Sequence, residues 1–255
     1  MQREEFVKQL WLDYIHHHPD IGGLRLWPLE APAAYLALVT LNYGPFAMQA
    51  MLPTLTHLGY RCQHRHAMAD RGLLVSLLAP PDEGTWLVLA ELQLASLSRR
   101  PRDRLEALVS QTPQVASPRQ PLVYDLRPWP MPTWDTYLSL HQAHPLASWL
   151  AVMGPRMHHA GFDCDQLGMD LLDIDTGMRT SGLNGYSDRH HGIFPVSPLL
   201  DYCFYPTLSQ RLAFAEGDEH RIALGGVALV QKQVSANQER TAELLLPHHT
   251  RCEMS

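Results

Sequence analysis

Two segments of the chain repeat one order of expected elements, and this repeat constrains the fold more than any other feature of the sequence. The first segment predicts a strand, a helix and three further strands, at residues 35–41, 46–58, 60–66, 73–78 and 86–94. The second predicts a strand, a helix or loop and three strands, at residues 157–164, 167–176, 192–196, 210–215 and 222–232. The expected fold class is therefore α+β, with two tandem β-rich modules that form a curved mixed sheet around a cleft.

Helices are expected to flank this sheet. Apolar residues recur at helical spacing over residues 4–18, 98–111, 134–141 and 146–153. Residues 112–132 are rich in Pro and Ser and make the best boundary between the two segments. We therefore expect one domain over residues 1–255, with module one at about 30–111, a linker at about 112–132 and module two at about 133–234.

Composition excludes several classes of function. The 255 residues are 45% hydrophobic and 18% charged, with a net charge of −6, so a basic nucleic-acid-binding face is not expected. The sequence has no long apolar run and a charged N-terminus, which argues against a membrane span or signal peptide. The four cysteines are scattered without a CxxC pair, which is typical of a reducing cytoplasm.

The stretch from Ser148 to Cys164 carries the most chemical information. It reads as a short helix, a Gly-Pro break and a strand that opens on His158 and His159. Because side chains alternate along a strand, one imidazole is expected to face the interior of the sheet and the other to face away. An inward histidine suits a metal or an acidic ligand, and a structural histidine is the simpler alternative.

Short motifs along most of the chain suggest a family. They are Trp11-Leu12-Asp13-Tyr14-Ile15, Leu36-Ala37-Leu38 with Thr40, Leu58-Gly59-Tyr60, Glu91-Leu92 with Leu97-Ser98, Arg127-Pro128-Trp129, Ala147-Ser148-Trp149, Gly154-x-Arg156-x-His158-His159 and Ser197-Pro198. In their order and spacing the chain resembles the bacterial 2-oxoadipate dioxygenase/decarboxylase family. That family is similar in fold to the vicinal-oxygen-chelate proteins, and its members use non-haem iron(II) to convert 2-oxoadipate to 2-hydroxyglutarate in lysine breakdown.

The resemblance implies a two-histidine, one-carboxylate iron site, which this sequence keeps only in part. The first histidine of the family falls on Tyr35, the second is retained as His159, and the carboxylate falls on Ala228. The family's substrate arginine falls on Val39. With one ligand of three, iron(II) or another divalent metal would be held weakly.

Three interpretations remain open from the sequence. In the first, an active enzyme has rebuilt its site with Glu91 and Tyr35 as catalytic or ligating groups beside His159. In the second, which the apolar replacements favour, the chain has no metal and binds a 2-oxo acid, an apolar organic ligand or a partner protein. That cleft would be lined by Val39, Ala228, Tyr202 and Phe204. In the third, the correspondence is displaced and a neighbour such as His158 or Asp163 does the work.

Overall fold

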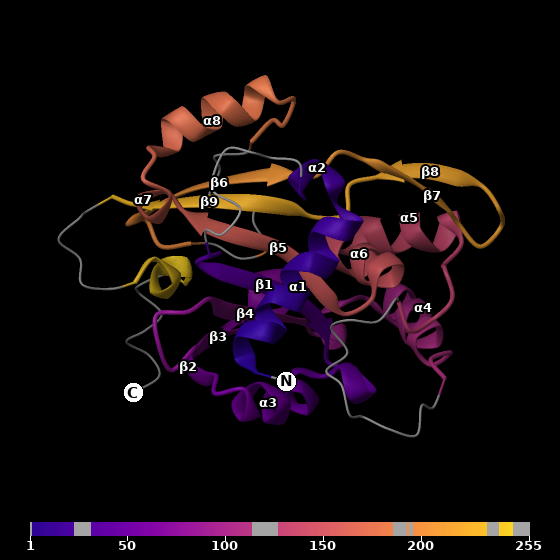
Figure 1. Cartoon of the computed structure of the whole chain (residues 1–255). Coiled ribbons are helices and arrows are strands. Elements are labelled where there is room, and N and C mark those ends of the chain that lie inside the picture. The colour runs from indigo at the N-terminus through magenta and orange to yellow at the C-terminus, as the bar shows by residue number, and fades with distance from the viewer. Residues whose placement is uncertain are drawn as a thin grey trace.

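A seven-stranded mixed sheet forms the centre of the molecule (Figure 1). The computed structural model describes residues 2–22, 32–113, 127–185, 193, 196–233 and 240–246. The strands lie in the order β2-β3-β4-β1-β5-β9-β6, and β7 and β8 form a separate hairpin. Their bounds are β1 Tyr35–Leu41, β2 Arg61–Met68, β3 Leu73–Ala79, β4 Trp86–Leu92, β5 Arg156–Asp163, β6 Leu200–Pro206, β7 Gln210–Ala213, β8 Glu219–Ile222 and β9 Gly226–Lys232.

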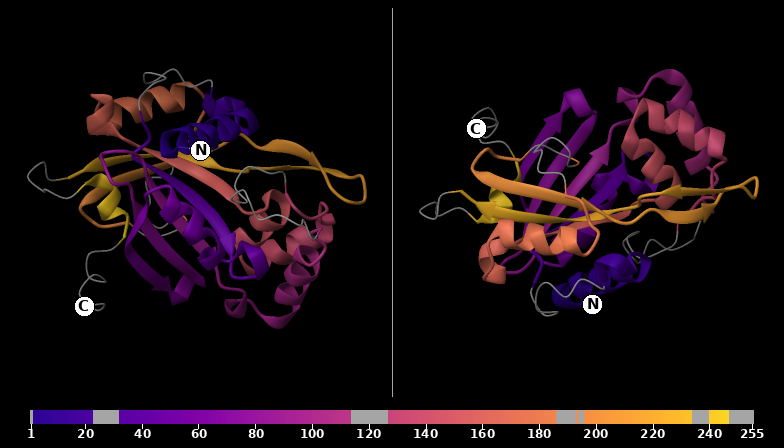
Figure 2. Two further views of the ribbon diagram at one scale, coloured as in Figure 1. Left: turned by 60° about the horizontal axis from the view of Figure 1, so that its bottom comes forward. Right: turned by 90° about the horizontal axis from the view of Figure 1, so that it is seen from above.

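The sheet joins the two segments that the sequence analysis identified. Strand β1 pairs parallel with β4, and β5 pairs parallel with β9, while β1 and β5 meet antiparallel at the centre. Strands β1, β2, β3 and β4 run in clearly different directions from β6 and β9, so the sheet is curved (Figure 2). The expected fold class, α+β with a curved mixed sheet flanked by helices, is confirmed.

Helices cover both faces of the sheet. Their bounds are α1 Arg3–His17, α2 Pro19–Gly22, α3 Met48–His57, α4 Arg99–Val109, α5 Trp134–Ala143, α6 Pro145–Met153, α7 Cys164–Leu167 and α8 Leu171–Thr180. Apolar side chains of α1, α3 and α8 form one core with one face of the sheet. Those of α4, α5, α6 and the 3-10 turn Thr241–Leu245 form a second core with the other face, which we call the inner face. None of the described helices has the length and apolarity of a membrane span.

Alternation along the strands assigns residues to the two cores. On β1, Tyr35, Ala37 and Val39 face the inner core, and Leu36 and Leu38 face the opposite core. Every residue of β1 is buried, as expected for a central strand covered on both faces. The position of a residue along these strands therefore decides which of two separate interiors its side chain enters.

The structure corrects several expected elements. The strand expected at 222–232 is shorter than predicted: it is β9, which begins at Gly226, while Ile222 ends β8 and residues 223–225 connect the two strands. Strand β6 was not predicted, although its apolar side chains pair along β9. The helix or loop expected at 167–176 is the end of α7 and the start of α8. The strand expected at 192–196 lies mostly outside the described residues.

Candidate functional site

Tyr35 and His159 meet in the inner core, at the centre of the sheet. The strands β1 and β5 bring them together, and their side chains are fully buried. The Tyr35 hydroxyl lies 3.2 Å from Nε2 of His159. Gly161 makes this contact possible, because a Cβ there would lie 1.9 Å from the Tyr35 ring. The missing side chain leaves the space that the tyrosine ring occupies.

His158 lies on the same side of the sheet as His159, which corrects the expectation that the two rings face opposite ways. The pairing of β1 with β5 shifts by one residue here: Ala37 pairs with His159 and Leu38 pairs with Met157, so His158 is the extra residue of a β-bulge. A bulge breaks the alternation of side chains. The two Nδ1 atoms lie 3.0 Å apart, and both rings contact Phe204.

The four residues expected to line a cleft fill the core instead. Val39, Ala228, Tyr202 and Phe204 all lie on the inner face, as expected, but they are buried in its apolar core. The ring of Phe204 covers Gly226, where a Cβ would lie 2.3 Å from it. The rings of Tyr35 and Phe204 therefore pack against His159, at the places that the resemblance gives to metal ligands.

The histidines and tyrosines form one hydrogen-bonded chain of neutral groups. The Tyr202 side chain lies beside the Tyr35 hydroxyl, which contacts His159, which in turn contacts His158. Burial lowers the pKa of His158 to about 3 and holds the pKa of His159 well below its usual value. Burial raises the pKa of the Tyr35 hydroxyl well above its usual value. Both imidazoles are therefore uncharged near pH 7, and Tyr35 is a phenol and not a phenolate.

Glu91 does not join this group, which corrects the expectation that it converges with His159. Glu91 pairs with Thr40 on β1 and follows Ala90, which faces the inner core together with Val39. Because side chains alternate along a strand, the Glu91 side chain points away from the inner face of the sheet. Its carboxylate accepts hydrogen bonds from the Met48 backbone N–H at 2.5 Å and from the side chain of Gln93 at 2.6 Å. These contacts tie β4 to the start of α3, which is a structural role.

The donor set around His159 does not fit a divalent metal. Tyr35 contacts Nε2 of His159, and His158 contacts its Nδ1. At the position where the resemblance places the carboxylate ligand, this chain has the buried Ala228. A phenol with a raised pKa is a poor metal ligand. Asp163 lies further along β5 and uses both carboxylate oxygens elsewhere, on Asp165 N–H and the Thr241 hydroxyl. Among the described residues, no group of three His, Cys, Asp or Glu side chains is arranged to hold a metal ion.

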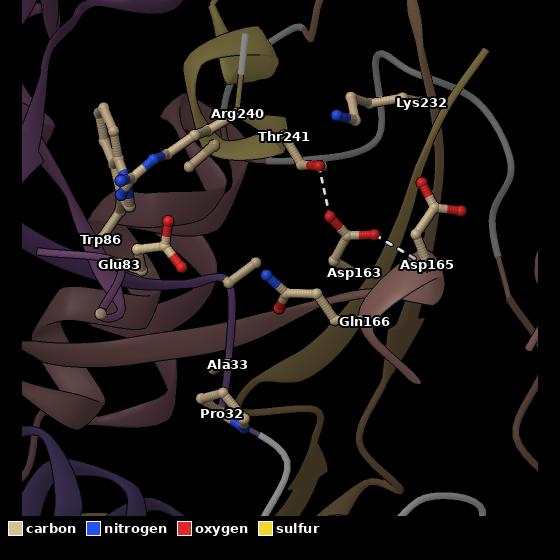
Figure 3. Close-up of a pocket in the computed structure, with 13 residues that line it drawn as sticks. Pro32, Ala33, Glu83, Trp86, Asp163, Asp165, Gln166, Lys232, Arg240 and Thr241 are labelled. Atoms are coloured by element: carbon tan, nitrogen blue, oxygen red, sulfur yellow. Dashed lines mark hydrogen bonds between the residues drawn. The ribbon is translucent and has the colours of Figure 1, made fainter. Parts of the chain in front are cut away.

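Two cavities lie along the inner face, and only the smaller one reaches this buried chain, at His158. A small one, of about 180 Å³, is lined by His158 and Trp149 and by residues of α5, α6 and the connection before β9. A larger cleft, of about 360 Å³, opens at the other end of the inner face (Figure 3). It is lined by Pro32, Ala33, Ala34, Glu83, Gly84, Trp86, Asp163, Asp165, Gln166, Lys232, Arg240, Thr241 and Ala242.

Solved structures share this architecture. A proposed hydrolase from Shewanella frigidimarina superposes with a TM-score of 0.82 at 19% identity, over 94% of this chain and 96% of that one. Hydroxyglutarate synthase from Oryza sativa, solved with 2-oxoadipate, gives 0.74 at 17%, over 90% and 80%. A proposed glyoxalase superfamily protein from Ralstonia eutropha gives 0.62 at 15%, over 79% and 72%. The chain has a vicinal-oxygen-chelate-like fold. No protein-family model and no curated protein matches the sequence.

In this vicinal-oxygen-chelate-like fold, sequence reasoning found the central residues but missed the larger cleft. Of the four strand positions expected to carry ligands, Tyr35, His159 and Ala228 lie on the inner face of neighbouring strands, and Glu91 lies on the opposite face. Sequence reasoning had not singled out Trp86 or Arg240. The lining of the larger cleft comes from several distant segments, so no local motif marks it.

Proposed function

We propose that this chain is a divergent relative of the hydroxyglutarate synthases that binds a small molecule without an iron centre. The observation that carries the proposal is the closed hydrogen-bonded chain at His159, in which both imidazole nitrogens already have partners. A metal ligand must offer a lone pair to the ion, and a 2-oxo acid chelates a metal that keeps open positions. Neither condition is met by the side chains around His159.

The residues around His159 support the proposal that this chain binds a small molecule and carries out no oxidative chemistry at His159. Val39 stands where the resemblance expects the substrate arginine, and it is buried among apolar side chains. A dicarboxylate moved into this core would lose its hydration without gaining the bidentate partner that an arginine provides. We therefore assign ligand binding to the cavities at the ends of the inner face, and stability to the packed aromatic centre.

The test is a metal analysis of the untagged protein, followed by oxygen-uptake measurements with 2-oxoadipate after anaerobic addition of iron(II). We expect substoichiometric iron and no uptake that depends on the 2-oxo acid. Stoichiometric iron that is lost in His159→Ala, together with 2-oxoadipate-dependent uptake, would overturn the proposal.

A reconstruction gives the complementary test. The double variant Tyr35→His/Ala228→Glu restores the histidine and the carboxylate that the resemblance places at these two positions. We expect the folded variant to retain iron(II). The matched control, Tyr35→His/Ala228→Gln, has a side chain of the same size but no carboxylate charge and is expected to retain much less. Circular dichroism shows whether each variant is folded. Equal and negligible iron retention in the two folded variants would contradict the assignment of these places.

A further inference from the structure

We infer that the larger cleft binds a small zwitterion of the free α-amino acid class. The inference rests on the proposed function, because it names the ligand that the chain binds, but it concerns different residues from those around His159. The cleft opens between the start of β4 and the end of β5, and the 3-10 turn Thr241–Leu245 closes one side of it (Figure 3).

Charges of both signs line the cleft. Glu83 and Arg240 lie on one wall, and Asp165 and Lys232 lie on the other (Figure 3). The remaining carboxylate, Asp163, is occupied within the protein by Asp165 N–H and the Thr241 hydroxyl. An anionic ligand would meet three carboxylates here, and a cationic ligand would meet two cations. A neutral ligand that carries one charge of each sign fits both walls.

A buried donor indicates where the carboxylate of the ligand lies. Trp86 lines the cleft with 4% of its surface exposed, and its indole Nε1 has no hydrogen-bond partner among the described residues. Buried N–H donors in folded proteins nearly always have an acceptor. A ligand carboxylate beside Trp86 would accept this hydrogen bond and would also lie near the Arg240 guanidinium, which is held by the Asp82 carbonyl at 2.8 Å.

The opposite wall suits an ammonium group. Asp165 carries a carboxylate, and the side chain of Gln166 projects toward the middle of the cleft (Figure 3). The N-cap hydrogen bond from Asp165 N–H to Asp163 fixes the start of α7, so this wall is ordered before a ligand arrives. The volume of about 360 Å³ lies near the lower end of small-molecule sites, which suits an amino acid better than a nucleotide.

The experiment is isothermal titration calorimetry of the full-length protein with each of the proteinogenic L-α-amino acids in turn. We expect at least one of them to bind with a dissociation constant below about 1 mM. The carboxylic acid and the amine that share its skeleton each lack one charge, and each is expected to bind at least about 10-fold more weakly.

Two variants locate the binding. Trp86→Phe keeps an aromatic ring and removes the donor, and Arg240→Gln removes an exposed cation; each is expected to weaken binding by about 10- to 100-fold. Arg221→Gln, on the exposed face of β8, is the matched control and is expected to bind as the wild type does. Since Arg240 is exposed, its variant remains informative even where Trp86→Phe fails to fold.

Three outcomes would overturn the inference: no amino acid binds, the analogue without the ammonium group binds equally well, or neither variant weakens binding. Failure of the proposed function has a different signature, because it is measured as iron content and 2-oxoadipate-dependent oxygen uptake. A protein that holds iron and still binds an amino acid through Trp86 and Arg240 would overturn the proposed function and leave the amino-acid site intact.

Discussion

Acidification from pH 7 to pH 5 is predicted to destabilise this protein through His158 and His159. An unfolded histidine has a pKa of about 6.5 and takes up a proton in this range. In the folded protein, burial lowers the pKa of His158 to about 3 and that of His159 well below its usual value, so both stay neutral. The unfolded state therefore binds more protons, and the stability present above pH 6.5 is lost as the pH falls toward the folded pKa values.

The size of the effect follows from proton linkage. A histidine that is neutral when folded and has a pKa of about 6.5 when unfolded loses about 2 kcal/mol of stabilisation between pH 7 and pH 5. Two such residues give about 4 kcal/mol, an upper bound because His158 borders the smaller cavity and retains some contact with solvent. This is a large share of the roughly 5–15 kcal/mol by which a domain is usually stable.

Urea unfolding at pH 7, 6 and 5 measures this loss directly. His158→Asn keeps an amide near the position of Nδ1 and removes the titrating ring, so the loss on acidification should shrink by about 2 kcal/mol, whatever the variant does to stability at pH 7. His18, whose pKa burial lowers to about 4, adds to the slope of both proteins and cancels in the comparison. His57→Asn, on the exposed surface of α3, is the control. An unchanged pH dependence in His158→Asn would refute the reasoning.

Other predictions concern packing and buried hydrogen bonds. Gly161→Ala should destabilise by about 2–4 kcal/mol in urea unfolding, because the new Cβ would overlap the Tyr35 ring, and the loss should be much smaller in a Tyr35→Leu background. Tyr14→Phe should cost about 2 kcal/mol or more, because its hydroxyl both donates to and accepts from the buried backbone at the start of β9; an unchanged urea midpoint would contradict this. Thr241→Val should cost about 1–3 kcal/mol, since the Asp163 carboxylate loses a buried donor, and Thr241→Ser should restore most of it.

The sequence was informative wherever one periodicity ran without interruption. The apolar run of β1 and the helical spacing of α4 were predicted within a few residues of their observed bounds. The order of elements around them led to the correct fold class, because a strand buried on both faces and an amphipathic helix each have one stable way to bury their apolar surface. The strand expected at 222–232 begins only at Gly226, because residues 223–225 connect β8 to β9, and composition does not show this.

The sequence by itself determined that this is an α+β chain with a curved mixed sheet, and its resemblance to a known family singled out Tyr35, His159 and Ala228. Only the tertiary structure decided what those positions do. A one-residue bulge turned His158 to the side of His159, and Gly161 let the Tyr35 ring close over the neighbouring strand. The phase of β4 sent Glu91 to the opposite core. Bulges, ring contacts and strand phase depend on residues far apart in the chain, and for that reason local patterns cannot specify them.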